Sequence, residues 1–234
     1  MRFRSGLLAL LLALSVCAPP RAFAALRSPQ VPVSGTVLQS YLDQQNPGIH
    51  AGLDQVNIQH WDDPNPNNGI FTLQLELGPK VPGVSVGVCS PGAAPLTLYE
   101  IFPATSGPGW FAVLSFRKSP DRLVVNLFDS NITLVRTTSY LGASVTGFSL
   151  YLQGADGVLY SEDALNPGGA AQWLAYFGLD LYAGTWWIAG ETTPVTGAAS
   201  DRDFADVVMF LEGSSCNCVP IQRSTWGAVK ARFR

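Results

Sequence analysis

The chain has 234 residues, enough for one or two β-domains, and only 13% of them are charged. Its 23 glycines, 17 prolines and hydrophobic fraction of 47% are typical of a turn-rich β-protein, and they exclude a disordered chain or a helical bundle. Because 14 Lys and Arg stand against 17 Asp and Glu, the chain lacks the basic excess that nucleic-acid binding requires.

The first 24 residues have the layout of a secretory signal peptide. Arg2 and Arg4 precede an apolar run over 7–16, and Ala22-Phe23-Ala24 forms a small-x-small cleavage site. We therefore expect cleavage after Ala24 and a secreted or cell-surface protein of bacterial type. The apolar run is too short to cross a bilayer, and no later stretch reaches the roughly 20 apolar residues of a transmembrane helix.

The remaining chain reads as a succession of short strands separated by turns. Residues 25–34 are expected to form a leader, and 36–41 a short helix or strand. Phe71, Leu73 and Leu75 alternate with polar residues, as in a half-buried strand, and 62–69 is a dense turn cluster. The predicted strands are 56–61, 70–77, 84–88, 96–102, 110–117, 123–128, 133–138, 147–152, 158–160, 172–177, 184–190 and 204–212. This pattern predicts an all-β fold, an antiparallel, jelly-roll-like β-sandwich, as a single domain over 25–213.

A cluster of carboxylates near the end of this domain is the strongest candidate for a functional site. Asp201, Asp203 and Asp206 lie within six residues, after a Gly- and Ser-rich turn and before an apolar strand. Glu191 ends the preceding strand and would join them if the two strands form a hairpin. Crowded carboxylates repel one another, and Ca²⁺ prefers such oxygen ligands. We expect one Ca²⁺ site here, although the spacing is not that of an EF-hand; the alternative is a solvated acidic turn.

The segment 149–212 resembles the DUF4114 family of exported bacterial proteins. The resemblance rests on the sequences Tyr-Ser-Glu-Asp-Ala-Leu-Asn at 160–166, Trp-Trp-Ile-Ala-Gly-Glu at 186–191 and Asp-Arg-Asp-Phe-Ala-Asp-Val-Val at 201–208. It implies a secreted or surface β-domain whose acidic motif binds calcium, and it implies no known activity. The chain departs from the family pattern at Thr192, Ala205 and 171–172, where a potential ligand is lost each time.

Two other functions are compatible with the sequence. The six tryptophans (Trp61, Trp110, Trp173, Trp186, Trp187 and Trp226) suggest a carbohydrate-binding module if some are exposed, although core packing is favoured. Trp186 and Trp187 should point to opposite sides of their strand, which would leave one of them exposed. A glycoside or ester hydrolase could pair Glu162 or Glu191 with an aspartate. His50 and His60 are the only histidines, and no nucleophile or metalloprotease motif is present, so we predict a non-enzymatic protein.

The cysteines leave several pairings open. Cys17 would mark a lipoprotein if the preceding residue were small, but that residue is Val16. Cys89 could pair with Cys216 or Cys218 after export, or all three could be free thiols. A redox pair or metal clip formed by Cys216 and Cys218 is the less favoured interpretation.

The C-terminal tail, residues 214–234, differs from the body in charge. It carries four bases and no acid, whereas the body over 25–213 has seven bases and 17 acids, a net charge of 7 − 17 = −10. Trp226, Val229 and Phe233 would share one face if the tail formed a short helix. A tag for secretion or surface attachment is an alternative. The sequence as a whole predicts an exported structural or adhesive domain, whose partner would be a surface glycan or an envelope or matrix component.

Overall fold

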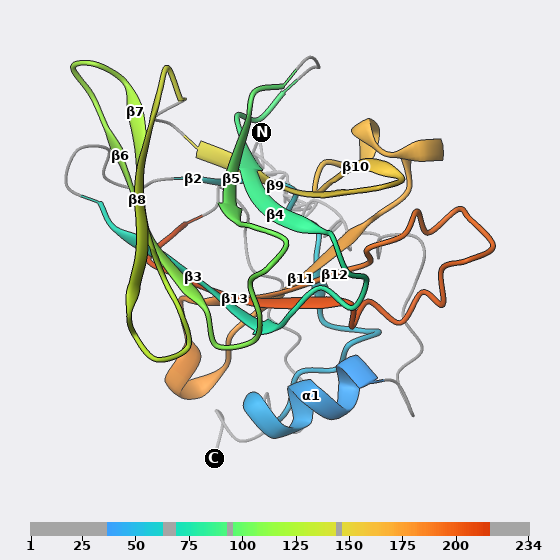
Figure 1. Ribbon diagram of the computed structural model, residues 1–234. Helices are drawn as coiled ribbons and strands as arrows, with labels where there is room; N and C mark the ends of the chain where they lie inside the picture. The colour runs from blue at the N-terminus through green and yellow to red at the C-terminus, as the bar shows by residue number, and fades with distance from the viewer. Residues whose placement is uncertain (1–36, 63–68, 93–95, 144–146, 216–234) are drawn as a thin grey trace, which may run out of the picture.

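The computed structural model describes residues 37–62, 69–92, 96–143 and 147–215 (Figure 1). The predicted signal peptide and leader, Cys216, Cys218, Trp226 and nearly all of the basic tail lie outside these residues. Within them, no helix is long and apolar enough to span a membrane.

Two antiparallel sheets form the body of the protein, which confirms the predicted all-β sandwich. The eight-stranded sheet has the order β1-β11-β12-β13-β3-β6-β7-β8, and the five-stranded sheet has the order β10-β9-β4-β5, with β2 paired to β9. The strands are β1 (Gln55–Val56), β2 (Trp61–Asp62), β3 (Phe71–Leu77), β4 (Ser85–Cys89), β5 (Leu98–Phe102), β6 (Phe111–Arg117), β7 (Arg122–Phe128), β8 (Leu134–Leu141), β9 (Gly147–Gly154), β10 (Gly157–Tyr160), β11 (Trp173–Phe177), β12 (Trp186–Gly190) and β13 (Val207–Glu212).

One predicted strand, 56–61, is wrong as a continuous element. Its two ends belong to different sheets, because Val56 pairs with β11 in the eight-stranded sheet and Trp61 pairs with β9. The chain crosses from one sheet to the other between them. This crossing places the Trp61 ring, which is fully buried, beside the core face of β9.

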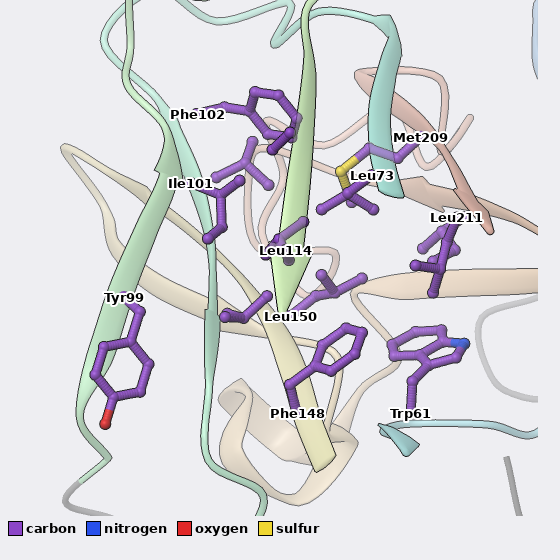
Figure 2. Packing of buried hydrophobic residues seen from close by; sticks show 14 of the residues in the cluster. Trp61, Leu73, Tyr99, Ile101, Phe102, Leu114, Phe148, Leu150, Met209 and Leu211 are labelled. Carbon is purple, nitrogen blue, oxygen red and sulfur yellow. The ribbon is translucent and has the colours of Figure 1, made fainter. Parts of the chain in front are cut away.

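The core between the sheets is built from the alternating apolar residues of each strand. Leu73, Leu114 and Leu150 are completely buried there. Aromatic rings fill one part of this core: Phe148 stacks on Phe71 with ring centroids 4.8 Å apart, and Trp61 lies 6.0 Å from Phe148. Figure 2 shows Trp61 and Phe148 adjacent, with Leu211 above them.

A second apolar cluster covers the outer face of the eight-stranded sheet at β11, β12 and β13. The helix α1 (Val37–Gln45) packs there through Leu38 and Leu42, which lie one turn apart and are fully buried (Figure 1). Trp186 points into the core between the sheets and Trp187 into this second cluster. The two rings therefore point to opposite faces as predicted, but neither is exposed, since α1 covers the outer face.

The edge strands of the two sheets, β5 and β8, differ in how their backbone groups are bonded. Strand β5 is the edge of the five-stranded sheet, and side chains from β8 donate hydrogen bonds to two of its carbonyl groups. Arg136 donates to the Glu100 and Ile101 carbonyl oxygens at 3.1 and 3.3 Å, and Tyr140 Oη donates to the Glu100 carbonyl oxygen at 2.7 Å. Strand β8 is the edge of the eight-stranded sheet and has no second neighbouring strand among the described residues.

Candidate metal centre

The loop from Glu191 to Asp206 joins β12 to β13 and brings four carboxylates together. The two strands pair as a hairpin, with Gly190 opposite Val207, so Glu191 and Asp206 leave the sheet side by side. Glu191, Asp201, Asp203 and Asp206 each contribute an oxygen to a group whose members all lie within 4.8 Å of one another. These are the four residues proposed from the sequence, and the group they form could hold a metal ion.

Glu191 is the innermost of the four. Its side chain is completely buried; its Oε1 accepts the Phe204 N–H at 2.7 Å and its Oε2 accepts the Ser200 hydroxyl at 2.8 Å. Burial raises the pKa of Glu191 to about 7, although these two hydrogen bonds oppose the shift. A bound cation would offset the cost of burying the ionised form.

Thr192 and Ala205, two of the departures from the family pattern, have structural roles in this loop. The Thr192 N–H and hydroxyl both donate to Asp206 Oδ2, at 3.0 and 2.6 Å, so Thr192 orients this carboxylate. The Ala205 N–H donates to Asp203 Oδ1 at 2.8 Å, and the Ala205 side chain packs in the second cluster. Both residues therefore hold neighbouring carboxylates of the centre in place.

Gln172, which directly precedes β11, supports the loop, and this role was not predicted from the sequence. Its side-chain amide donates to the Glu191 and Thr193 carbonyl oxygens, at 2.8 and 2.6 Å, and its Oε1 accepts the Val195 N–H at 3.2 Å. Gln172 is buried, so this amide holds the start of the loop against the sheet. Ala171 and Gln172 are the two positions at which the resemblance to DUF4114 leads one to expect an acidic residue and a His.

Lys80 is the second residue that the sequence analysis missed, and it bears directly on the centre. Its Nζ lies 3.2 Å from Asp201 Oδ2, 3.4 Å from Asp203 Oδ2 and 3.2 Å from Asp206 Oδ1. Its backbone N–H also donates to the Asp206 carbonyl oxygen at 3.0 Å. Partial burial lowers the pKa of Lys80, but its hydrogen bonds to Asp201 and Asp206 outweigh this effect and keep the pKa above its ordinary value. The ammonium group thus neutralises part of the acidic cluster.

Phe204 anchors the acidic segment to the body of the protein. Its ring is fully buried in the second cluster, although its backbone has a φ of 52°, which non-glycine residues rarely adopt. Arg202, two residues earlier, has a φ of 57°. Burial of the Phe204 ring and its N–H bond to Glu191 favour this backbone, and they fix the aspartates on either side of it.

The unfolding free energy in EDTA should depend on pH through Glu191. Its pKa is about 7 in the folded protein, above its ordinary value of 4.5. The folded state therefore binds the proton more tightly, and the stability it contributes is complete below about pH 4.5 and is lost as the pH rises through about 7. Urea unfolding between these pH values should show a decline in wild type and a flatter profile in Glu191→Gln. The same pH dependence of the unfolding free energy in both proteins would show that Glu191 is not the source of the decline.

Gly190, immediately before Glu191, should not tolerate a side chain. A Cβ placed there would lie 2.7 Å from Cε3 of the buried Trp173, which is paired with Gly190 from the neighbouring strand β11. We expect Gly190→Ala to lower the unfolding free energy by about 1–3 kcal/mol, as overpacking typically does. The control is Gly107→Ala, where a Cβ would meet no atom within 4 Å. Equal urea midpoints for the two variants would contradict the expected clash.

The other candidates from the sequence have structural roles in the described residues. Trp61, Trp173, Trp186 and Trp187 are buried, and Trp110 is partly buried against the core, so the first four cannot stack on a glycan. Glu162 accepts the Ser149 hydroxyl at 2.5 Å and the Gly92 N–H at 3.1 Å. The Asn166 side chain bonds both backbone groups of Tyr160, as expected of a turn residue.

Cys89 has no disulfide partner among the described residues, and its two potential partners lie outside them. Its side chain is buried, and burial together with the charge of Glu162 raises the pKa of the thiol to about 12. The Cys89 thiol is therefore un-ionised at neutral pH, and it is not a nucleophile in this environment.

Comparison of the chain with protein-family models, with curated proteins and with solved structures finds no significant match. The resemblance to DUF4114 therefore remains a prediction, and the function is inferred from the acidic centre.

Proposed function

We propose that this protein is an exported, non-enzymatic structural or adhesive β-domain of the cell envelope or extracellular matrix, stabilised by one Ca²⁺ bound at the acidic centre. The observation behind this proposal is the convergence of Glu191, Asp201, Asp203 and Asp206 within 4.8 Å at the end of one hairpin. The expected signal peptide and the resemblance to an exported family support the location.

The donor set fits Ca²⁺ better than a transition metal. All four groups offer hard carboxylate oxygens, which Ca²⁺ prefers, and none of them is the His or Cys ligand that zinc usually takes. Two like charges about 4 Å apart near a protein surface repel each other by roughly 4 kcal/mol. Lys80 is the one base in ion-pair contact with the centre among the described residues, so four carboxylates face a single positive charge. The negative charge that remains favours a further cation.

The position of the centre indicates what a cation would do for the protein. Glu191 directly follows β12, Asp206 directly precedes β13, and Asp201 and Asp203 belong to the loop between them. A Ca²⁺ held by these residues would supply positive charge that ties the loop to the sheet. Extracellular calcium-binding modules bind with dissociation constants of about 10⁻⁴–10⁻³ M, which is sufficient where calcium is millimolar. An exported domain would then have a higher unfolding free energy outside the cell, where calcium is bound, than before export.

Thermal unfolding of the protein over 25–234, in excess EDTA and in millimolar calcium, tests the proposed site. A ligand that binds only the native state at a hundredfold excess over Kd stabilises it by about 2.7 kcal/mol, so calcium should raise the unfolding midpoint. Asp203→Ala should remove the rise, whereas Asp156→Ala, on the exposed β9–β10 turn, should retain it. Equal midpoints for wild type with and without calcium would reject the calcium site. Recovery of chain cleaved after Ala24 outside the cytoplasm tests the proposed export.

A further inference from the structure

The tip of the β7–β8 hairpin carries a sequence motif that the acidic centre does not explain. Asn131-Ile132-Thr133 is the single Asn-x-Ser/Thr triplet in the sequence. In exported proteins such a triplet, with any residue except proline in the middle, is the acceptor of N-linked glycans. The triplet occurs here at the connection between two strands of the eight-stranded sheet, and all three of its residues are exposed.

The hairpin tip presents the Asn131 side chain to solvent. The Asp129 carboxylate accepts the backbone N–H groups of Asn131 and Thr133, both at 2.9 Å, and thereby fixes the tip. The hydrogen bonds that fix this turn use the backbone of Asn131 and leave its side-chain amide out. The amide nitrogen is therefore accessible in the folded protein, and no packed contact would be lost on its modification.

Large apolar side chains are exposed both in the triplet and along β8, the edge strand that follows it. Ile132 has a φ of 64° and is 74% exposed, and Leu134, Val135 and Leu141 are 53%, 47% and 70% exposed. Arg136 is the one charged residue of β8, and it points inward to Glu100 on β5. Strand β8 has eight residues and no proline, and its protection against edge-to-edge pairing is limited to the inward-pointing Arg136 and the bulge at Val135, where the register with β7 shifts.

The other edges of the two sheets are short or covered. Strand β1 has two residues and β10 has four, while the Glu100 and Ile101 carbonyls of the five-residue strand β5 accept hydrogen bonds from Arg136 and Tyr140. Strand β8 is thus the longest open edge in the described part of the protein, and the triplet lies immediately before it. A bulky hydrophilic group at Asn131 would screen both the exposed apolar residues and the start of this edge.

We infer that Asn131 is the acceptor of an N-linked glycan that shields the β8 edge; this rests on the proposed export. The co-reactant is an oligosaccharide on a polyisoprenoid pyrophosphate, used by a transferase of the exporting cell. A bond forms between Asn131 Nδ2 and the anomeric carbon, and the bond from that carbon to the pyrophosphate oxygen breaks. The lipid pyrophosphate leaves with the electron pair, the amide nitrogen loses one proton to a base of the transferase, and no redox change occurs.

Mass spectrometry of the full chain, recovered after export from the organism that makes it, tests this inference. Trypsin releases the peptide 123–136, which contains the triplet. We expect this peptide to carry glycan mass, and an amidase that removes N-glycans should convert Asn131 to Asp. Asn131→Gln and Thr133→Ala should abolish the added mass and Thr133→Ser should retain it, while all three variants keep the backbone N–H groups that bond Asp129.

The outcomes separate this inference from the proposed function. Exported chain that yields only the unmodified peptide would overturn the glycan and leave the export standing. Chain retained in the cytoplasm with residues 1–24 attached would overturn both. Removal of the glycan from exported protein should increase light scattering through pairing of β8 edges, and unchanged scattering would overturn the shielding role.

Discussion

Lys80→Met is expected to tighten calcium binding at the acidic centre by about tenfold or more, equivalent to at least about 1.4 kcal/mol. The Lys80 ammonium lies within 3.4 Å of three aspartate side chains, so an ion that binds there must displace it. The Lys80 side chain is 53% exposed and flexible, and it can move into solvent when an ion enters. Methionine keeps the length of the chain without its charge, and it removes both the competitor and the repulsion on the ion.

Without calcium the same substitution should have the opposite effect on stability. Wild-type Lys80 offsets part of the repulsion among the carboxylates, and Lys80→Met leaves that repulsion unopposed. Because the ammonium is half-exposed and screened by solvent, we expect a loss of only about 1 kcal/mol in EDTA. The variant should therefore gain more from calcium than wild type does.

Calorimetric titration with calcium and thermal unfolding in EDTA measure the two effects of Lys80→Met. Lys118→Met is the matched control, because it removes the same charge from the turn between β6 and β7. An unchanged or weaker calcium affinity in Lys80→Met, with wild type still binding, would show that Lys80 does not compete with the ion. Absence of binding in both proteins would instead reject the calcium site.

Phe148→Ala is expected to lower the unfolding free energy by about 3–5 kcal/mol, as large-to-small changes of buried aromatic residues do. The Phe148 ring is 1% exposed and contacts three other aromatic rings, those of Trp61, Phe71 and Phe116. It extends from β9 toward rings carried by β3 and β6 of the opposite sheet. Its loss would leave a cavity where the two sheets meet (Figure 2).

Urea unfolding measures the loss of unfolding free energy in Phe148→Ala, and Phe128→Ala is the control. Phe128 makes a similar stack, with its ring centroid 4.8 Å from that of Phe111, but both rings are partly exposed on the outer face of the sheet. The same chemical change there should cost less than half as much, since solvent can fill the space. Similar losses for the two variants would mean that the aromatic core between the sheets is not the main source of stability.

The strands and the acidic group were predictable from the sequence because both depend on local patterns. Alternation such as that of 71–75 requires one buried face, and each of the other predicted strands overlaps a strand of the structure. Asp201, Asp203 and Asp206 are close in sequence, and the hairpin adds Glu191 by a pairing between neighbouring strands. The failure at 56–61 has a different cause, because an apolar run does not show that its two ends belong to different sheets.

The sequence by itself determined the all-β class, the position of most strands and the four carboxylates of the centre. Only the tertiary structure placed Lys80, which is 121 residues from Asp201 in the chain, among those carboxylates. It alone showed that Gln172 supports the loop and that α1 buries Trp187 on the outer face of the sheet. The physical reason is that periodicity and spacing record contacts between near neighbours, whereas ion pairs and packing between distant segments depend on how the two sheets and the helix come together.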